Sequence, residues 1–391
     1  MSEAKSFLRT WAAVLLIGVA APASAGQLNL GFVYDGWNSN FLSEQSQVNT
    51  NYGCECWVPF SLSLNLDKGL MVYGSGLFGA GSYTYSPDGI TNTTINLTNF
   101  ADTVLGGEIQ FKTFGQSSLL NVSVSLPTGD PTWETKQIDA IIPTEFMDYR
   151  YRGRGLGFSA LYGLTFPFGK DALGMGAGFS YSGAFNPTGA PSDSLQLGDT
   201  MFLAFNYTQT GLNGYKEIAR LCGFYSLASQ DPAEGVNYQL GTNLNASYSW
   251  FDPAGLSMDL GIQYFLPSSR LDVDNNLVLE ADNFYAPRFY ARPSYVWGEV
   301  KWSVMVKYVL PNDYPATYSI TGVNPMYFGG GWVLGVGPTW KMPLNDKSSL
   351  SFFGMYDYIL QDNAGVGASG NSLVNATYNY WTLGTNYQID L

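Results

Sequence analysis

Residues 331–344, GWVLGVGPTWKMPL, alternate between two kinds of side chain. Trp332, Leu334 and Val336 are apolar, whereas Gly335 and Gly337 beside them are small. Successive side chains of a β-strand point to opposite faces, so one face of this strand is apolar and the other is small or polar. The same alternation recurs at 237–251, 256–266 and 301–310. The pattern predicts an all-β chain whose polar strand faces are turned toward water.

The composition shows few charges and many aromatic residues. The 391 residues are 46% apolar, 16% aromatic and only 13% charged, whereas a soluble domain has about 25% charged residues. The aromatic content excludes a disordered chain. After the N-terminus, no apolar run reaches the ~20 residues that a membrane helix needs. Together with the alternation, this composition predicts a closed antiparallel transmembrane β-barrel whose apolar face meets lipid.

The chain contains no His. Catalysis by Ser-His-Asp or Cys-His groups and metal sites built on His are therefore excluded. We expect no enzymatic activity, no cofactor and no metal. The three cysteines, Cys54, Cys56 and Cys222, are expected to have no catalytic role.

The first 25 residues have the features of a secretory signal peptide. Lys5 and Arg9 precede the short apolar stretch 11–19, and Ala23-Ser24-Ala25 is a small-residue cleavage site. The predicted mature chain, 26–391, has 16 basic and 30 acidic residues and a net charge of −14. This charge argues against nucleic acid as a partner.

Short turns rich in Gly, Asn and Asp divide the mature chain into hairpins. Seven such turns, alternating with eight longer connections, predict sixteen strands. The expected strands are 27–35, 56–66, 70–85, 103–114, 118–126, 155–168, 173–186, 199–209, 215–228, 237–251, 256–267, 288–297, 300–310, 331–344, 349–360 and 376–391. The alternation is weakest at 70–85 and 215–228. If one hairpin were absent, the barrel would have fourteen strands.

The last strand carries a family resemblance. Trp381, Leu383, Tyr387, Ile389 and Leu391 share one face, as in the C-terminal strand of bacterial outer-membrane proteins, although that family usually ends in Phe or Trp. The chain resembles a Gram-negative outer-membrane porin. The resemblance implies an integral outer-membrane channel for passive diffusion of ions and small hydrophilic solutes. Outer-membrane lipid and lipopolysaccharide would surround it, and a homotrimer is one assembly to test.

Two other functions stay open at this point. The barrel could sheathe a periplasmic or extracellular partner protein, such as a multihaem cytochrome in a porin–cytochrome conduit. It could also be a fourteen-stranded channel for hydrophobic substrates, although polar faces rich in Asn, Ser, Gly and Gln argue against that function. Only a co-purified partner would separate the channel from the sheath, and conductance in a planar bilayer is the single most useful experiment.

The connection 127–154 is the candidate constriction loop. General diffusion porins fold their third long loop into the lumen, and the stretch 143–148 loosely resembles the Pro-Glu-Phe segment of such loops. Its carboxylates are candidates for the acidic side of a constriction: Asp130, Glu134, Asp139, Glu145 and Asp148. The alternative is a solvated external loop. A second acidic segment with Asp272 and Asp274 predicts a cation-attracting outer vestibule.

Charged residues within strands are expected to face the lumen, because Lys or Arg facing lipid near the bilayer midplane costs ~2–4 kcal/mol. The phase of the strands turns the following residues inward as candidate pore wall: Glu108, Lys112, Asp259, Arg288, Arg292, Lys301, Lys307, Lys341 and Asp357. Basic walls opposite an acidic loop would create a transverse field. The alternative is internal salt bridging. With the net charge of −14, we expect a mild cation preference.

Overall fold

The computed structural model describes residues 25–43, 48–67, 69–85, 92–130, 153, 155–186, 195–196, 199–211, 214–226, 228–231, 236–239, 242–265, 268–272, 277–281, 287–310, 312–313, 327–328, 330–362 and 373–391. Within these ranges, no helix is long and apolar enough to cross a membrane.

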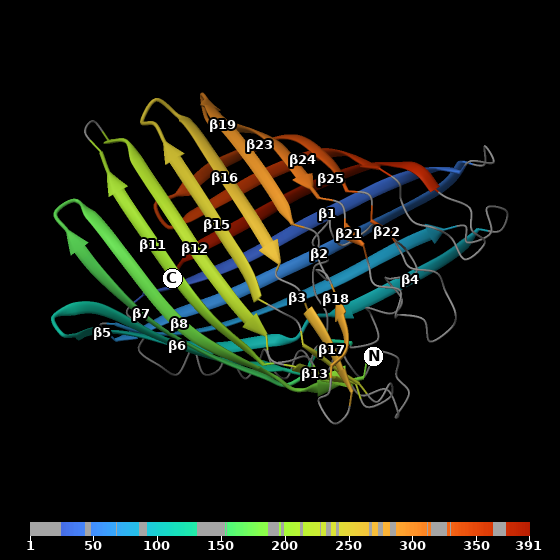
Figure 1. Cartoon of the computed structure of the whole chain (residues 1–391). Coiled ribbons are helices and arrows are strands. Elements are labelled where there is room, and N and C mark those ends of the chain that lie inside the picture. The colour runs from blue at the N-terminus through green and yellow to red at the C-terminus, as the bar shows by residue number, and fades with distance from the viewer. Residues whose placement is uncertain are drawn as a thin grey trace.

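Sixteen strands form a closed antiparallel barrel (Figure 1). They are β1 (Ala25–Ser43), β2 (Val48–Asp67), β3 (Leu70–Tyr85), β5 (Thr103–Thr113), β6 (Gln116–Leu126), β7 (Gly157–Phe168), β8 (Asp171–Ser182), β11 (Thr200–Thr210), β12 (Lys216–Ser226), β15 (Thr242–Phe251), β16 (Leu256–Phe265), β19 (Arg288–Trp297), β20 (Val300–Val309), β23 (Gly331–Asn345), β24 (Ser348–Asp362) and β25 (Leu373–Asp390). Each strand pairs with its neighbours in chain order. The barrel closes where β1 pairs with β25, from Gln27 opposite Asp390 to Ser43 opposite Leu373.

The predicted number of sixteen strands is confirmed, and short turns join the strands that were predicted to form hairpins. Gly115 and Gly169 have φ angles of 78° and 63° in two of the short turns. Glycine adopts these angles without the steric cost that a side chain would add. Because successive strands are antiparallel, the short turns lie at one end of the barrel and the long connections at the other, which we call the loop end (Figure 1).

The fourth strand has a one-residue irregularity. A further strand, β4 (Thr93–Phe100), pairs with β3 up to Phe78 opposite Phe100. The pairing then continues with β5, from Ser75 opposite Val104. One extra residue is accommodated between these pairs, as in a β-bulge. β4 thus continues β5 toward the loop end, where the sequence predicted a long loop.

The two faces of the barrel wall differ as the alternation predicted. On β23, Trp332, Leu334 and Val336 are 45–47% exposed on the outer face, whereas Val333 between them is 4% exposed on the inner face. An apolar and solvent-exposed outer surface is what a barrel needs in order to sit in lipid. The architecture expected from the resemblance to outer-membrane porins is confirmed.

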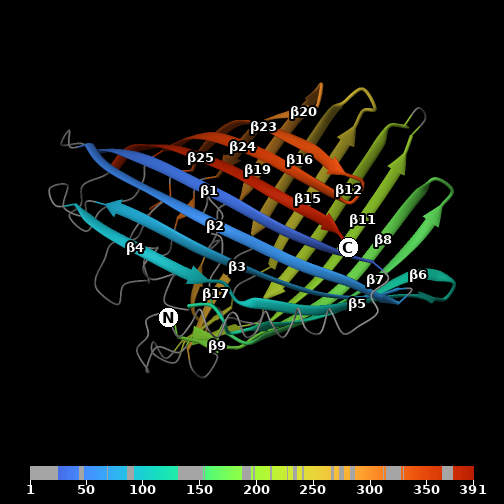
Figure 2. The same ribbon diagram turned by 180° about the vertical axis from the view of Figure 1, so that it is seen from behind.

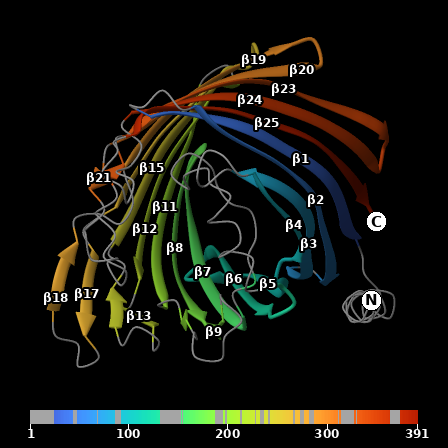
Figure 3. The same cartoon turned by 90° about the vertical axis from the view of Figure 1, so that its right-hand side faces the viewer.

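A second antiparallel sheet lies beyond the loop end of the barrel. Its strands are β9 (Ala184–Phe185), β10 (Leu195–Gln196), β13 (Ala228–Asp231), β14 (Val236–Gln239), β17 (Ser268–Asp272) and β18 (Leu277–Ala281). Figure 2 and Figure 3 show its strands beyond the loop ends of the barrel strands. A two-stranded sheet joins β21 (Asn312–Asp313) to β22 (Tyr327–Phe328). The predicted strand 237–251 is therefore divided between this outer sheet and the barrel.

The first hairpin is longer than predicted. Leu42 still pairs with Val48, although the alternation predicts that the first strand ends at residue 35 and the second begins at 56. Residues 38–43 and 48–53 are mostly polar on both faces, so apolar alternation gives no strand signal there. The extension carries the wall of β1 and β2 past the ends of the shorter strands, as Figure 1 shows.

Candidate functional site: the inner wall of the barrel

The strand register places all the predicted pore-wall residues on the inner face. Residues paired directly across neighbouring strands share a face, and Arg292 pairs with Asp259 on β16. On β20, Lys307 pairs with the buried Val333. The same relation places the other candidates inward: Glu108, Lys112, Arg288, Lys301, Lys341 and Asp357.

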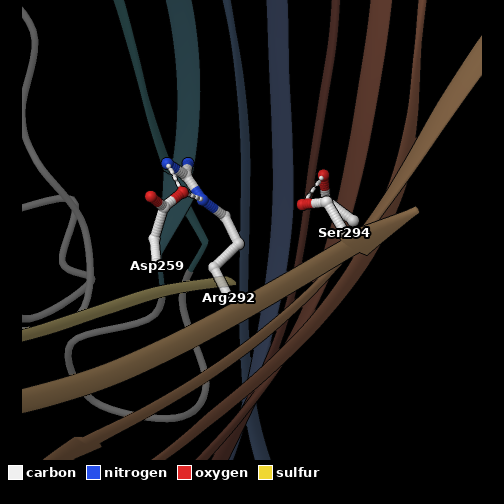
Figure 4. Close-up of polar contacts among 4 residues, drawn as sticks. Asp259, Arg292 and Ser294 are labelled. Carbon is white, nitrogen blue, oxygen red and sulfur yellow. Dashed lines mark hydrogen bonds and ion pairs between the residues drawn. The ribbon is translucent and has the colours of Figure 1, made fainter. Parts of the chain in front are cut away.

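One ion pair is formed between two of these candidates. The Nη2 of Arg292 lies 3.0 Å from Oδ2 of Asp259, and its Nε donates to the same oxygen at 3.3 Å. The Ser249 hydroxyl also donates a hydrogen bond to the Asp259 carboxylate. Figure 4 shows the two charged side chains pointing toward each other from neighbouring strands. The Arg292 side chain is 45% exposed. The pair is therefore in contact with water, and the guanidinium group of Arg292 remains accessible to solutes.

The described inner face separates its charges between walls. From β12 to β24 the inward residues are mostly basic: Lys216, Arg220, Arg288, Arg292, Lys301, Lys307 and Lys341, against Asp259 and Asp357. On β1, β2 and β5 they are mostly acidic, with Asp35, Glu55 and Glu108 against Lys112. Between these walls, the inward positions of β6, β7, β8 and β11 carry no charge. Asp35 and Glu55 are buried, so a charged solute would meet the basic wall on one side and a wall that exposes Glu108 and Lys112 on the other.

An apolar cluster covers the inner face near the loop end, where the alternation predicts small or polar residues. Its buried members come from seven adjacent strands: Val33, Trp37, Trp57, Leu77, Tyr83, Val309, Val333, Ile359 and Tyr378. The rings of Trp37 and Tyr83 lie 5.3 Å apart. The available signal was Asp35, which is in phase with Val33 and Trp37 and, being charged, had to face inward.

Two buried carboxylates lie beside this cluster. Asp35 and Glu55 are directly opposite each other on β1 and β2, at 3% and 7% exposure. Asp35 accepts hydrogen bonds from the Tyr380 hydroxyl at 2.8 Å and the Thr382 hydroxyl at 2.7 Å. The Tyr83 hydroxyl donates to Glu55. Hydrogen bonds of this kind offset the cost of removing carboxylates from water.

The two ends of the candidate constriction loop are held together. A Cβ atom on Gly153 would lie 2.5 Å from the carbonyl carbon of Gly129, so the two backbones are in close contact. The Gly129 amide donates to the Asp102 carboxylate at 2.9 Å, and the Thr103 amide donates to the Thr128 hydroxyl at 2.8 Å. The loop base is thereby fixed to the wall at the β4–β5 irregularity.

Only one of the predicted loop carboxylates falls in the described part of the chain. Asp130 follows directly on the fixed loop base. Glu134, Asp139, Glu145 and Asp148 lie outside the described residues. A cavity of about 430 Å³ lies next to the base, lined on the wall side by Asn29, Ser61, Ser75, Leu77, Val104 and Asn386.

The cysteines lie on different faces. Cys222 pairs with Asn245 and faces inward, whereas Cys54 pairs with Gly36 and faces outward, as does Cys56. All three are free thiols. No group of three or more potential metal ligands of the His, Cys, Asp or Glu type occurs among the residues that the structure describes.

Comparison with known proteins finds likeness only among solved structures. No family model matches the chain, and no curated protein matches it. A BenF-like porin from Pseudomonas fluorescens Pf-5 is 10% identical over 94% of this chain and 100% of that one, with a TM-score of 0.47. OccAB1 from Acinetobacter baumannii is 9% identical over 95% and 99%, also at 0.47. A FadL homologue from Pseudomonas aeruginosa is 8% identical over 94% and 92%, at 0.42.

Proposed function

We propose that the chain is an outer-membrane channel through which ions and small hydrophilic solutes diffuse passively. The observation that carries the proposal is the inward placement of strand charges in a closed barrel whose outer face is apolar; outward charges such as Asp171 and Glu217 lie beside short turns. Ionised side chains need water or a partner, and Arg292 is nearly half exposed although it lies on the inner wall. A water-filled lumen meets this need, and solutes can diffuse through it.

Conductance of the purified protein in a planar bilayer tests this function. We expect discrete conductance steps whose size increases with salt concentration. A correctly folded barrel that gives no steps would contradict the proposal. It would instead favour a barrel filled by a partner protein, which co-purification from outer membranes would then reveal.

We further propose a mild cation preference. It is supported by the net charge of −14 for residues 26–391 and by the carboxylates of the loop, and it is opposed by the basic wall of β19, β20 and β23. A low-dielectric wall concentrates the field of charges in a pore. Screening acts over ~8–10 Å at physiological salt, so the preference should fall as ionic strength rises.

The loop carboxylates can be tested separately from the outer vestibule. In the variant Asp139→Asn/Glu145→Gln/Asp148→Asn, we expect the reversal potential in a salt gradient to shift toward anions. The matched control, Asp272→Asn/Asp274→Asn, changes charges in the outer segment and should shift it less. An unchanged reversal potential in the loop variant would remove the loop from the pore.

A further inference from the structure

Two inward tyrosines lie flat against the barrel wall because each faces a glycine on the neighbouring strand. Tyr290 on β19 is directly opposite Gly261 on β16. A Cβ atom added to Gly261 would lie 2.2 Å from Cε1 of Tyr290 and 2.4 Å from its Cζ. Carbon atoms in contact normally lie about 3.5–4.0 Å apart. The Tyr290 ring therefore occupies the space that any larger residue at position 261 would need.

A second pair repeats this arrangement. Tyr73 on β3 is opposite Gly106 on β5, and a Cβ atom on Gly106 would lie 2.3 Å from Cζ of Tyr73. The Tyr73 hydroxyl reaches across β5 and donates to Oδ1 of Asn121 on β6 at 2.9 Å. The order of pairing places β3 and β5 third and fourth around the barrel, and β16 and β19 eleventh and twelfth. The two pairs therefore lie on opposite walls of a sixteen-stranded barrel.

Side chains in strands usually stand roughly perpendicular to the sheet, which in a barrel means toward the axis. A tyrosine displaced from its glycine would thus return to a rotamer that points into the lumen. For Tyr290 this direction lies between Arg288 and Arg292 on its own strand, with Lys307 opposite. Cationic side chains near an aromatic face would hold the ring there. A single methyl group at position 261 would therefore narrow the lumen beside its basic wall.

We propose that Gly261 and Gly106 keep the Tyr290 and Tyr73 rings out of the lumen, and thereby leave the pore open to larger solutes. The glycines act as positioning residues, because they give the rings a place to lie flat. This inference rests on the proposed channel function and concerns which solutes pass. It does not concern whether the barrel conducts at all.

The decisive variant is Gly261→Ala, compared with Gly163→Ala as a matched control. Gly163 is also an inward glycine, on β7, but a Cβ atom there would meet nothing closer than 3.7 Å. We expect Gly261→Ala to lower single-channel conductance and to slow the entry of larger uncharged sugars into proteoliposomes, whereas Gly163→Ala changes neither. The double variant Gly261→Ala/Tyr290→Ala should restore both. A general loss of structure would not be reversed by removing a further side chain.

The outcomes separate this inference from the proposed function. A wild-type barrel without conductance would contradict the channel itself. A conducting wild type with an unchanged Gly261→Ala variant, or a double variant that stays narrow, would overturn the inference alone. Heat-modifiable migration on gels reports folding in every case. If Gly261→Ala does not fold, the conductance of Tyr290→Ala tests the inference instead. A ring that lies flat leaves conductance nearly unchanged when it is removed, and a marked rise would show that it already projects into the lumen and would overturn the proposal.

Discussion

The variant Val304→Lys tests the assignment of outer and inner faces. Val304 is 45% exposed on the outer face of β20 and pairs with Val336, which is 47% exposed. It lies near the middle of its strand, so a lysine here would place its charge in the apolar part of the bilayer. Such a placement costs ~2–4 kcal/mol. The unfolding equilibrium constant should rise by about 30-fold to about 700-fold.

The neighbouring variant Ser303→Lys is the matched control. Ser303 faces inward and shares a 2.8 Å hydrogen bond with Ser294, whose loss costs about 0.5–1.5 kcal/mol, while the new ammonium group can remain in water. Reversible urea unfolding in lipid vesicles, followed by tryptophan fluorescence, measures both free energies. If Ser303→Lys destabilised the barrel as much as Val304→Lys, the assignment of the two faces would be wrong.

Three further changes test the barrel end, the loop base and the lumen charge. Leu391→Asp places a charge where the exposed apolar face of β25 ends, so outer-membrane levels measured by fractionation should fall, and normal levels would make the C-terminal resemblance irrelevant. Asp102→Ala removes the acceptor for the Gly129 amide, at a cost of about 1 kcal/mol. Proteases should then cut residues 131–152 faster, and an unchanged rate would show that this bond does not hold the loop base. Asp259→Asn leaves Arg292 without its ion pair and should shift the reversal potential toward anions, most clearly at low salt. A shift toward cations would contradict a lumen-facing arginine.

The strand number and the inward charges could be predicted because lipid imposes a strict alternation. Within the membrane, every second residue must be apolar, and charge on that face is costly. Lys307 and Val306 therefore reveal the two faces of β20 without any structure. The rule fails beyond the membrane, where both faces meet water. This is why the loop-end halves of β1 and β2 and all of β4 were predicted as loops, although threonines such as Thr93 and Thr94 favour strands.

The inner apolar cluster and the tyrosine–glycine pairs could not be predicted in the same way. Alternation tells which face a residue occupies, but not which residue stands opposite it on the next strand. Whether Tyr290 faces Gly261 depends on the register of β16 and β19, which is fixed by pairing across the intervening connection. The role of the loop carboxylates is likewise set by where the loop folds, and no local pattern encodes that position.

Reaction of Cys222 with a charged thiol reagent tests the central claim of a water-filled lumen most directly. Cys222 faces inward on β12, whereas Cys54 and Cys56 face outward, so the variant Cys54→Ser/Cys56→Ser leaves one thiol, which faces the lumen. During bilayer recording at mildly alkaline pH, a membrane-impermeant methanethiosulfonate should lower the conductance of this variant, and Cys222→Ser should abolish the effect. A folded, conducting barrel whose Cys222 stays unmodified, or whose conductance does not change once Cys222 is modified, would contradict the claim that the inner face of the barrel lines its water-filled lumen.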